Sequence, residues 1–319
     1  MSPKMDRRRF MKGSVAASTG AALGFRFEEK ALLAQAAEGP GESPAPAQAE
    51  KLPTGKIGNL EFTRLICGGN LISGHAHSRD LIYVSSLLRN YFTDDKVIET
   101  LKLCENQGID TMLLRLDQHV LRIVDRFWNQ EGGKLKWICQ VKPSEQDMTT
   151  AIDVCVDNGA VAAYIQGEVG DRFWRSNRVD LIAKATEHIK SKGVAAGIGA
   201  HSLGVIQACE KEGLAPDFYM KTLNSKSYWS AGPKERHDSV WEETPEETIE
   251  FMKTVKAPWI GFKVLGAGAI QPREGFKYAF ENGADFLCVG MFDFQVEEDV
   301  QIARETLSGD LQRTRPWCA

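Results

Sequence analysis

The chain has 319 residues, of which 43% are hydrophobic and 26% charged, and its formal net charge at pH 7 is −4. This composition is typical of a globular protein and excludes a disordered chain. No run of about 18 apolar residues is present, so no transmembrane anchor is predicted, and the acidic balance predicts no nucleic acid as a partner.

The first 36 residues form a segment of their own. They contain RRRFMK at residues 7–12, a weakly apolar run at 13–23 and Ala-Gln-Ala at 34–36. The segment resembles a twin-arginine signal peptide, which implies the twin-arginine export machinery as a partner and a periplasmic or extracellular location. A disordered basic tail is the alternative. The segment holds seven Lys or Arg and three Asp or Glu, so the rest of the chain carries a net charge of −8.

Residues 37–52 are rich in Pro, Gly and Ala and predict a linker. A single domain is expected over residues 53–319, because strand and helix patterns alternate there. The expected strands are 62–67, 110–115, 136–142, 161–166, 194–201, 218–223, 259–265 and 286–291. The expected helices are 95–106, 120–129, 145–156, 179–192, 203–211, 245–256, 273–281 and 296–307.

Eight such units in about 250 residues predict a (β/α)8 TIM barrel. A doubly wound open sheet is the second possibility, but it usually carries a Gly-x-Gly-x-x-Gly turn after its first strand, and residues 67–70 read Cys-Gly-Gly-Asn.

In a barrel of this class the carboxyl ends of the strands form one face, where catalysis takes place. We expect a small-molecule substrate there, a carbonyl or polyhydroxylated compound. Lys142 and His201 are predicted to handle its protons, with Arg115 to orient it and Asp110 to hold Lys142 charged. The predicted substrate-binding residues are Asn70, Gln166, Glu168, Lys221, Asn224 and Trp229.

Several segments, in order, resemble the aldo/keto reductases over residues 57–307. They are the opening GKIGNLEF at 55–62, GIDT at 108–111, Lys142, GIGAHS at 197–202, VLGAG at 264–268, and Val289-Gly290 followed by EEDV at 297–300. The resemblance implies an oxidoreductase-like barrel with NAD(P) as cofactor, and Asp110 and Lys142 match two catalytic residues of the family. It also implies a cofactor-binding set of Gly266, Gly268, Gly290, Asp293, Gln295 and Glu298.

The chain departs from that family at three places. Arg115 stands where the proton-donating tyrosine is expected, and an arginine stays protonated near neutral pH. Gln166 or Gly167 replaces the histidine that ends the fourth strand. Acidic residues replace the basic ones that hold the 2′-phosphate of NADPH, so NADPH-dependent reduction is expected to be absent or slow.

A divalent metal is the alternative cofactor. His75 and His77 lie one residue apart, and Glu168 and His201 could complete a ligand set across the barrel mouth. That arrangement would suit a metal-dependent hydrolase, lyase or isomerase. A barrel without catalytic activity, exported as a binding protein, is the third interpretation.

Overall fold

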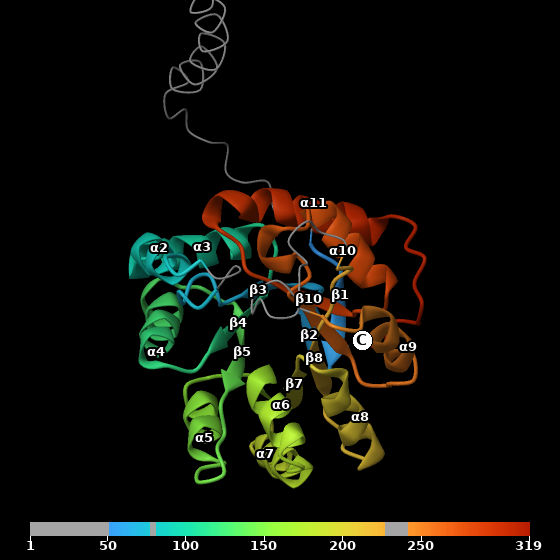
Figure 1. Ribbon diagram of the computed structural model, residues 1–319. Helices are drawn as coiled ribbons and strands as arrows, with labels where there is room; N and C mark the ends of the chain where they lie inside the picture. The colour runs from blue at the N-terminus through green and yellow to red at the C-terminus, as the bar shows by residue number, and fades with distance from the viewer. Residues whose placement is uncertain (1–50, 77–80, 227–241) are drawn as a thin grey trace, which may run out of the picture. The chain divides into compact units, whose positions relative to one another are not determined.

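The computed structural model describes residues 51–76, 81–226 and 242–319 (Figure 1). Eight parallel strands close into a barrel in the order β10-β3-β4-β5-β6-β7-β8-β9, which confirms the (β/α)8 prediction. The barrel strands are β3 (Leu65–Gly68), β4 (Thr111–Arg115), β5 (Lys136–Val141), β6 (Ala162–Ile165), β7 (Ala195–Ala200), β8 (Phe218–Thr222), β9 (Trp259–Phe262) and β10 (Phe286–Val289).

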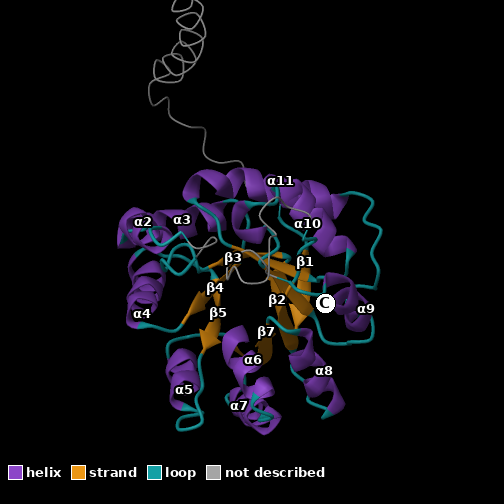
Figure 2. Cartoon of the chain, in the orientation of Figure 1, coloured by secondary structure: helices purple, strands orange, loops and turns teal. Residues whose placement is uncertain are grey.

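Helices surround the strands (Figure 2). They are α2 (Val84–Tyr91), α3 (Asp94–Asn106), α4 (Gln118–Asp125), α5 (Thr150–Asp157), α6 (Gly167–Arg175), α7 (Val179–Ser191), α8 (Leu203–Lys211), α9 (Pro245–Met252), α10 (Pro272–Glu281) and α11 (Val296–Ser308). A π-helical turn, η1 (Arg126–Gln130), continues α4, and two 3-10 turns, η2 (Gly266–Gly268) and η3 (Asp293–Gln295), follow β9 and β10. Within the described part of the chain, no helix combines the length and the hydropathy that a membrane crossing requires.

An antiparallel hairpin, β1 (Thr54–Ile57) and β2 (Leu60–Thr63), precedes the barrel. Its Ile57 and Phe62 are fully buried in one cluster with the inward-facing side chains Ile66 and Phe286. The strand predicted over residues 62–67 was therefore wrong at its start. The chain changes from hairpin to barrel at Arg64, between Thr63 of β2 and Leu65 of β3.

Alternation along each strand separates an inner core from an outer one. In β8, Phe218 and Met220 belong to the inner cluster, whereas Tyr219 packs outward among residues of the helical layer. Glycine is required in the neighbouring β7, because a Cβ on Gly197 would lie 2.3 Å from the ring of Phe218. The large ring fills the barrel interior that the glycine leaves open.

Two helices, α2 and α6, were not predicted. Gly167 and Gly170 lower the helical propensity of α6, but a Cβ at Gly170 would lie 2.3 Å from the carbonyl oxygen of Gly199. The glycine thus allows α6 to pack directly on β7, and this tertiary requirement outweighs propensity.

The helix predicted over residues 145–156 starts later, at Thr150. Asp147 Oδ1 accepts the backbone N–H groups of Thr149 and Thr150 at 3.1 and 3.0 Å, so its carboxylate pairs donors at the start of the helix.

We predict that the residues before Lys51 contribute nothing to the stability of the barrel. A chain beginning at Lys51 keeps Leu52, which is only 2% exposed and belongs to the core, and should show the same melting temperature as the full chain by differential scanning calorimetry. A chain beginning at Thr54 loses that side chain, whose burial is worth about 1.5–3 kcal/mol, and should melt several degrees lower. A clear loss of stability in the first truncation would contradict the domain boundary.

Candidate functional site

A buried carboxylate fixes His201 at the carboxyl end of β7. His201 Nδ1 lies 2.8 Å from Asp171 Oδ2, and Asp171 is carried by α6. The carboxylate also accepts the backbone N–H groups of His201 at 3.1 Å and Ser202 at 3.0 Å. With three donors around it, Asp171 is held in place and sets the orientation of the ring.

The other ring nitrogen is available for proton transfer. The Asp171 bond assigns the proton of neutral His201 to Nδ1, which leaves Nε2 as the acceptor. The imidazole is 34% exposed, while the Asp171 side chain beneath it is 3% exposed. This is the arrangement of an oriented general base.

Burial lowers the pKa of His201, and the positive charges of Lys263 and Lys221 lower it further, against the opposing effects of Asp171. The ring is thus neutral at pH 7 and can take up a proton. Gly167 leaves room for the imidazole, since a Cβ there would lie 3.0 Å from His201 Cε1.

A second polar group surrounds Arg115, which ends β4. Arg115 Nε lies 3.1 Å from Asp117 Oδ2. Asp117 Oδ1 accepts the backbone N–H of Val120 at 2.8 Å and so caps α4. Burial lowers the pKa of His75, and the positive charges of Arg115 and Lys142 contribute, which places these side chains in one electrostatic neighbourhood.

The strand registers bring the two groups to one level. Arg115 pairs with Gln140, Gln140 with Tyr164, and Tyr164 with Gly197. In a barrel of shear eight the level advances by about one residue per strand. The position on β7 level with Arg115 is therefore about three residues beyond Gly197, next to His201, and Lys142 reaches a similar level beyond the end of β5.

Asp110 does not lie at this mouth. It precedes β4, accepts the backbone N–H of Thr63 at 2.9 Å and pairs with Lys136 Nζ at 2.6 Å. Lys136 opens β5 and Lys142 follows its far end, so the expected pair of Asp110 with Lys142 is wrong.

Two further acids also lie directly before a barrel strand, as Asp110 does. Asp217, before β8, accepts the backbone N–H of Ala196 at 2.8 Å, and Asp285, before β10, accepts that of Trp259 at 2.9 Å. Each carboxylate thus ties the start of its own strand to the start of the preceding one. Asp110 also has a structural role, because it connects Thr63 of the hairpin with Lys136 at the start of β5, and the acid at the mouth beside Arg115 is Asp117.

Lys221 faces away from the barrel interior, because its neighbour Met220 belongs to the inner cluster. Its side chain is fully buried, forms an ion pair with Glu242 and donates to Thr222 Oγ1 at 2.9 Å. Asn224 is also buried, and its amide oxygen accepts the backbone N–H of Lys226 at 3.2 Å. Both residues hold the segments that follow β8, so the prediction that they face a substrate does not fit their positions.

The other predicted substrate residues differ in their surroundings. Gln166 is the residue before α6, and its Oε1 is buried without a hydrogen-bond partner. The backbone carbonyl of Asn70 accepts the N–H groups of His75 and Ala76 in a turn. Glu168 is exposed on the first turn of α6. Trp229 and His77 lie outside the described residues.

The metal alternative gains no support. Over residues 51–76, 81–226 and 242–319, the structure brings no three His, Cys, Asp or Glu side chains together as a metal site would require. One nitrogen of His201 is already engaged by Asp171.

The predicted cofactor residues lie beyond β9 and β10. Gly266 and Gly268 form the turn η2 with left-handed φ values of 52° and 84°. Gly290 is covered by Leu71, since a Cβ there would lie 3.1 Å from Leu71 Cγ.

The acidic members of that set do not fit the 2′-phosphate of NADPH. Asp293 accepts from Tyr91 Oη at 2.5 Å and from Lys96 Nζ at 2.9 Å, so it joins η3 to α2 and α3. Gln295 Oε1 accepts the backbone N–H of Phe292 at 3.1 Å. Helix α11 then opens with three acids, Glu297, Glu298 and Asp299, where a phosphate would be repelled.

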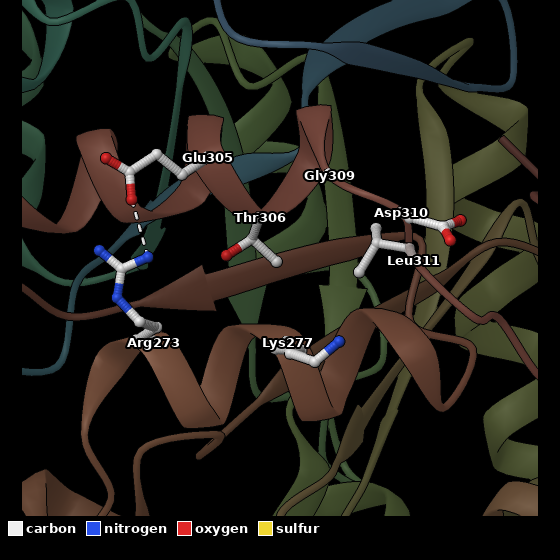
Figure 3. Close-up of a pocket in the computed structure, with 7 residues that line it drawn as sticks. All are labelled: Arg273, Lys277, Glu305, Thr306, Gly309, Asp310 and Leu311. Atoms are coloured by element: carbon white, nitrogen blue, oxygen red, sulfur yellow. Dashed lines mark ion pairs between the residues drawn. The ribbon is translucent and has the colours of Figure 1, made fainter.

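Two surface hollows lie among the outer helices. One, of about 220 Å³, is lined by residues of α10, α11 and the segment 309–311, and the ion pair of Arg273 with Glu305 at 2.7 Å crosses it (Figure 3). The other, of about 380 Å³, lies against α3 and η1. Neither is lined by any of the predicted site residues.

No family model and no curated protein matches the sequence. Solved structures do resemble the chain. A protein from Pseudomonas aeruginosa, provisionally assigned as an aldo-keto reductase, has a TM-score of 0.56 at 14% identity, covering 82% of this chain and 96% of its own. A variant of Gox0644 in complex with NADPH has a TM-score of 0.53 at 8% identity, covering 84% of this chain and 98% of its own.

The fold is that of the aldo-keto reductases. At these identities the likeness extends to the fold alone, and the expected resemblance is confirmed at that level.

The buried ion pair of Lys221 with Glu242 should be a strong determinant of stability. Glu242→Gln leaves a buried ammonium without its counter-charge and should lower the free energy of unfolding by about 3–5 kcal/mol, measured by urea denaturation. The double variant Lys221→Met/Glu242→Leu removes both charges and should recover most of the loss. Lys253→Met breaks the exposed pair with Glu250 and serves as the control; a loss as small for Glu242→Gln as for this control would contradict the prediction.

Proposed function

We propose that this chain is an enzyme with an aldo-keto reductase-like barrel that transfers protons on a small carbonyl or polyhydroxylated substrate. The observation that carries the proposal is the Asp171–His201 pair, because it presents an oriented, neutral imidazole at the face where barrels of this class perform chemistry. Arg115 and Lys142 at the same level supply positive charge for substrate oxygens.

The chemistry that this geometry suits is proton abstraction next to a carbonyl. His201 Nε2 would take the proton from the carbon, the electron pair would move onto the carbonyl oxygen, and a cation would stabilise the oxygen's negative charge. The imidazolium would return the proton to the neighbouring carbon of the enediolate, while the hydroxyl proton moves from one oxygen of the enediolate to the other. The reaction needs no oxidant or reductant, and a single base returns the proton on the face from which it took it, so isomerisation follows directly.

A nicotinamide cofactor is not part of this proposal. The NADPH complex belongs to Gox0644, and in this chain Asp293 is already paired and the start of α11 is acidic. The mouth also holds Arg115 where a proton-donating tyrosine was expected.

We therefore predict that reduction of simple aldehydes by NADPH will be absent or very slow. General acid catalysis contributes a factor of roughly 10² to 10⁴, and the acids beyond β10 weaken binding of the 2′-phosphate. A steady-state assay at 340 nm with an aldehyde panel measures this. Turnover near 1 s⁻¹, an ordinary enzyme rate, would show that the chain is a reductase after all.

Proton transfer itself is tested by exchange with solvent. Incubation of aldoses and ketoses with the protein in D₂O should replace the hydrogen next to the carbonyl, seen as loss of its ¹H NMR signal. His201→Gln should slow the exchange by roughly 10²- to 10⁴-fold, and Asp171→Asn should slow it because the ring loses its orientation. The rate should persist below pH 6.5 and fall only as pH drops through the lowered pKa of His201.

His188→Gln is the matched control, because His188 is bonded to Asp153 in the helical layer. Exchange that proceeds equally well in His201→Gln, or no exchange with any member of the panel, would refute the proposed function.

A further inference from the structure

Two cationic side chains, Arg115 and Lys142, lie at the carboxyl ends of the paired strands β4 and β5, although the chain as a whole is acidic. The charges of Arg115, Lys142 and Asp117 all act on the nearby His75, where Asp117 opposes the two cations. Lys142 is exposed and forms no ion pair with any residue of the described ranges. Two further acids of the described residues, Asp171 and Glu242, already hold His201 and Lys221.

The Asp117 charge is itself shared. One carboxylate oxygen lies near Arg115 Nε, and the other accepts the N–H that opens α4. The acid therefore stabilises a helix terminus as well as the guanidinium, and it forms no ion pair with Lys142.

The Arg115 side chain is only 21% exposed. Its Nε is buried and makes no well-aligned hydrogen bond, and its two terminal nitrogens have no hydrogen-bond partner among the residues that the structure describes. A guanidinium that is partly shielded from water and has unpaired N–H donors lowers the stability of the folded state unless a hydrogen-bond acceptor binds to it. Its planar pair of terminal N–H donors matches the two oxygens of a carboxylate.

We infer that the substrate carries a carboxylate, which Arg115 binds through its terminal nitrogens with Lys142 beside it. This rests on the proposed function and adds the substrate class: a sugar acid or other hydroxy or keto acid, with its carboxylate near β4 and β5 and its reacting carbon near His201. The two ends of the substrate would then be held at one level of the barrel.

Matched sugars test the inference with the full-length chain. D-Glucuronate, D-glucose and D-glucose 6-phosphate differ at one carbon, and D-galacturonate with D-galactose gives a second acid–neutral pair. Isothermal titration calorimetry at low salt should show at least one acid binding at least tenfold more tightly than its neutral partner. It should also bind more tightly than D-glucose 6-phosphate, because the fork of Arg115 fits a planar carboxylate.

Two variants separate the charge from its geometry. Arg115→Lys keeps the positive charge but loses the planar pair of terminal N–H donors, and should weaken binding of the acid at least tenfold. Lys142→Met alters an exposed side chain, so the fold is not at risk, and should weaken binding severalfold. Lys56→Met removes an exposed charge from the hairpin β1–β2 and should leave binding unchanged.

Equal binding of acids and neutral sugars, tighter binding of the phosphate, or full binding by both mouth variants would overturn the inference. Failure of the proposed function looks different. If neutral sugars undergo His201-dependent proton exchange and acids bind no more tightly, the proposed function holds and the carboxylate inference is wrong. If acids bind through Arg115 but no sugar undergoes proton exchange, the carboxylate site holds and the proposed function is wrong.

Discussion

The interaction on which the mouth of this barrel depends is the set of three hydrogen bonds that Asp171 accepts. One carboxylate holds the imidazole of His201, the N–H of the same residue and the N–H of Ser202. The bonds tie α6 to the end of β7 and the start of α8 while they orient the ring. A change that moved α6 would therefore also move the proton-accepting nitrogen, which couples helix packing to chemistry.

The two ends of the barrel use carboxylates for different purposes. At the amino-terminal end, Asp217 and Asp285 accept backbone N–H groups of the preceding barrel strands, and Asp110 accepts that of Thr63 in the hairpin. At the carboxyl end, Asp117 and Asp171 engage Arg115 and His201. The first use stabilises the closure of the sheet, and the second positions groups that can act on a ligand, in keeping with the division of stability and activity between the two faces of such barrels.

Glycines explain both the success and the failure of the sequence prediction around β7. The uncharged run at 194–200 was correctly predicted as a buried strand, because charge-free runs of that length rarely have another place in a globular domain. The same small residues allow α6 to lie against the strand, at Gly170 over Gly199. Helix α6 was not predicted for that reason, and neither was the role of Asp171. Glycine has a low helix propensity, and propensity takes no account of a tertiary contact that requires glycine.

The sequence by itself determined the alternation of strands and helices, the class of the barrel and the placement of Arg115, Lys142 and His201 at strand ends, because these depend on local periodicity. Only the tertiary structure decided which acid belongs to which cation. Asp110 pairs with Lys136 and not Lys142, His201 with Asp171, and Lys221 with Glu242. Such pairs depend on strand register and on the side of the sheet that a residue faces, and a shift of one residue exchanges the two sides.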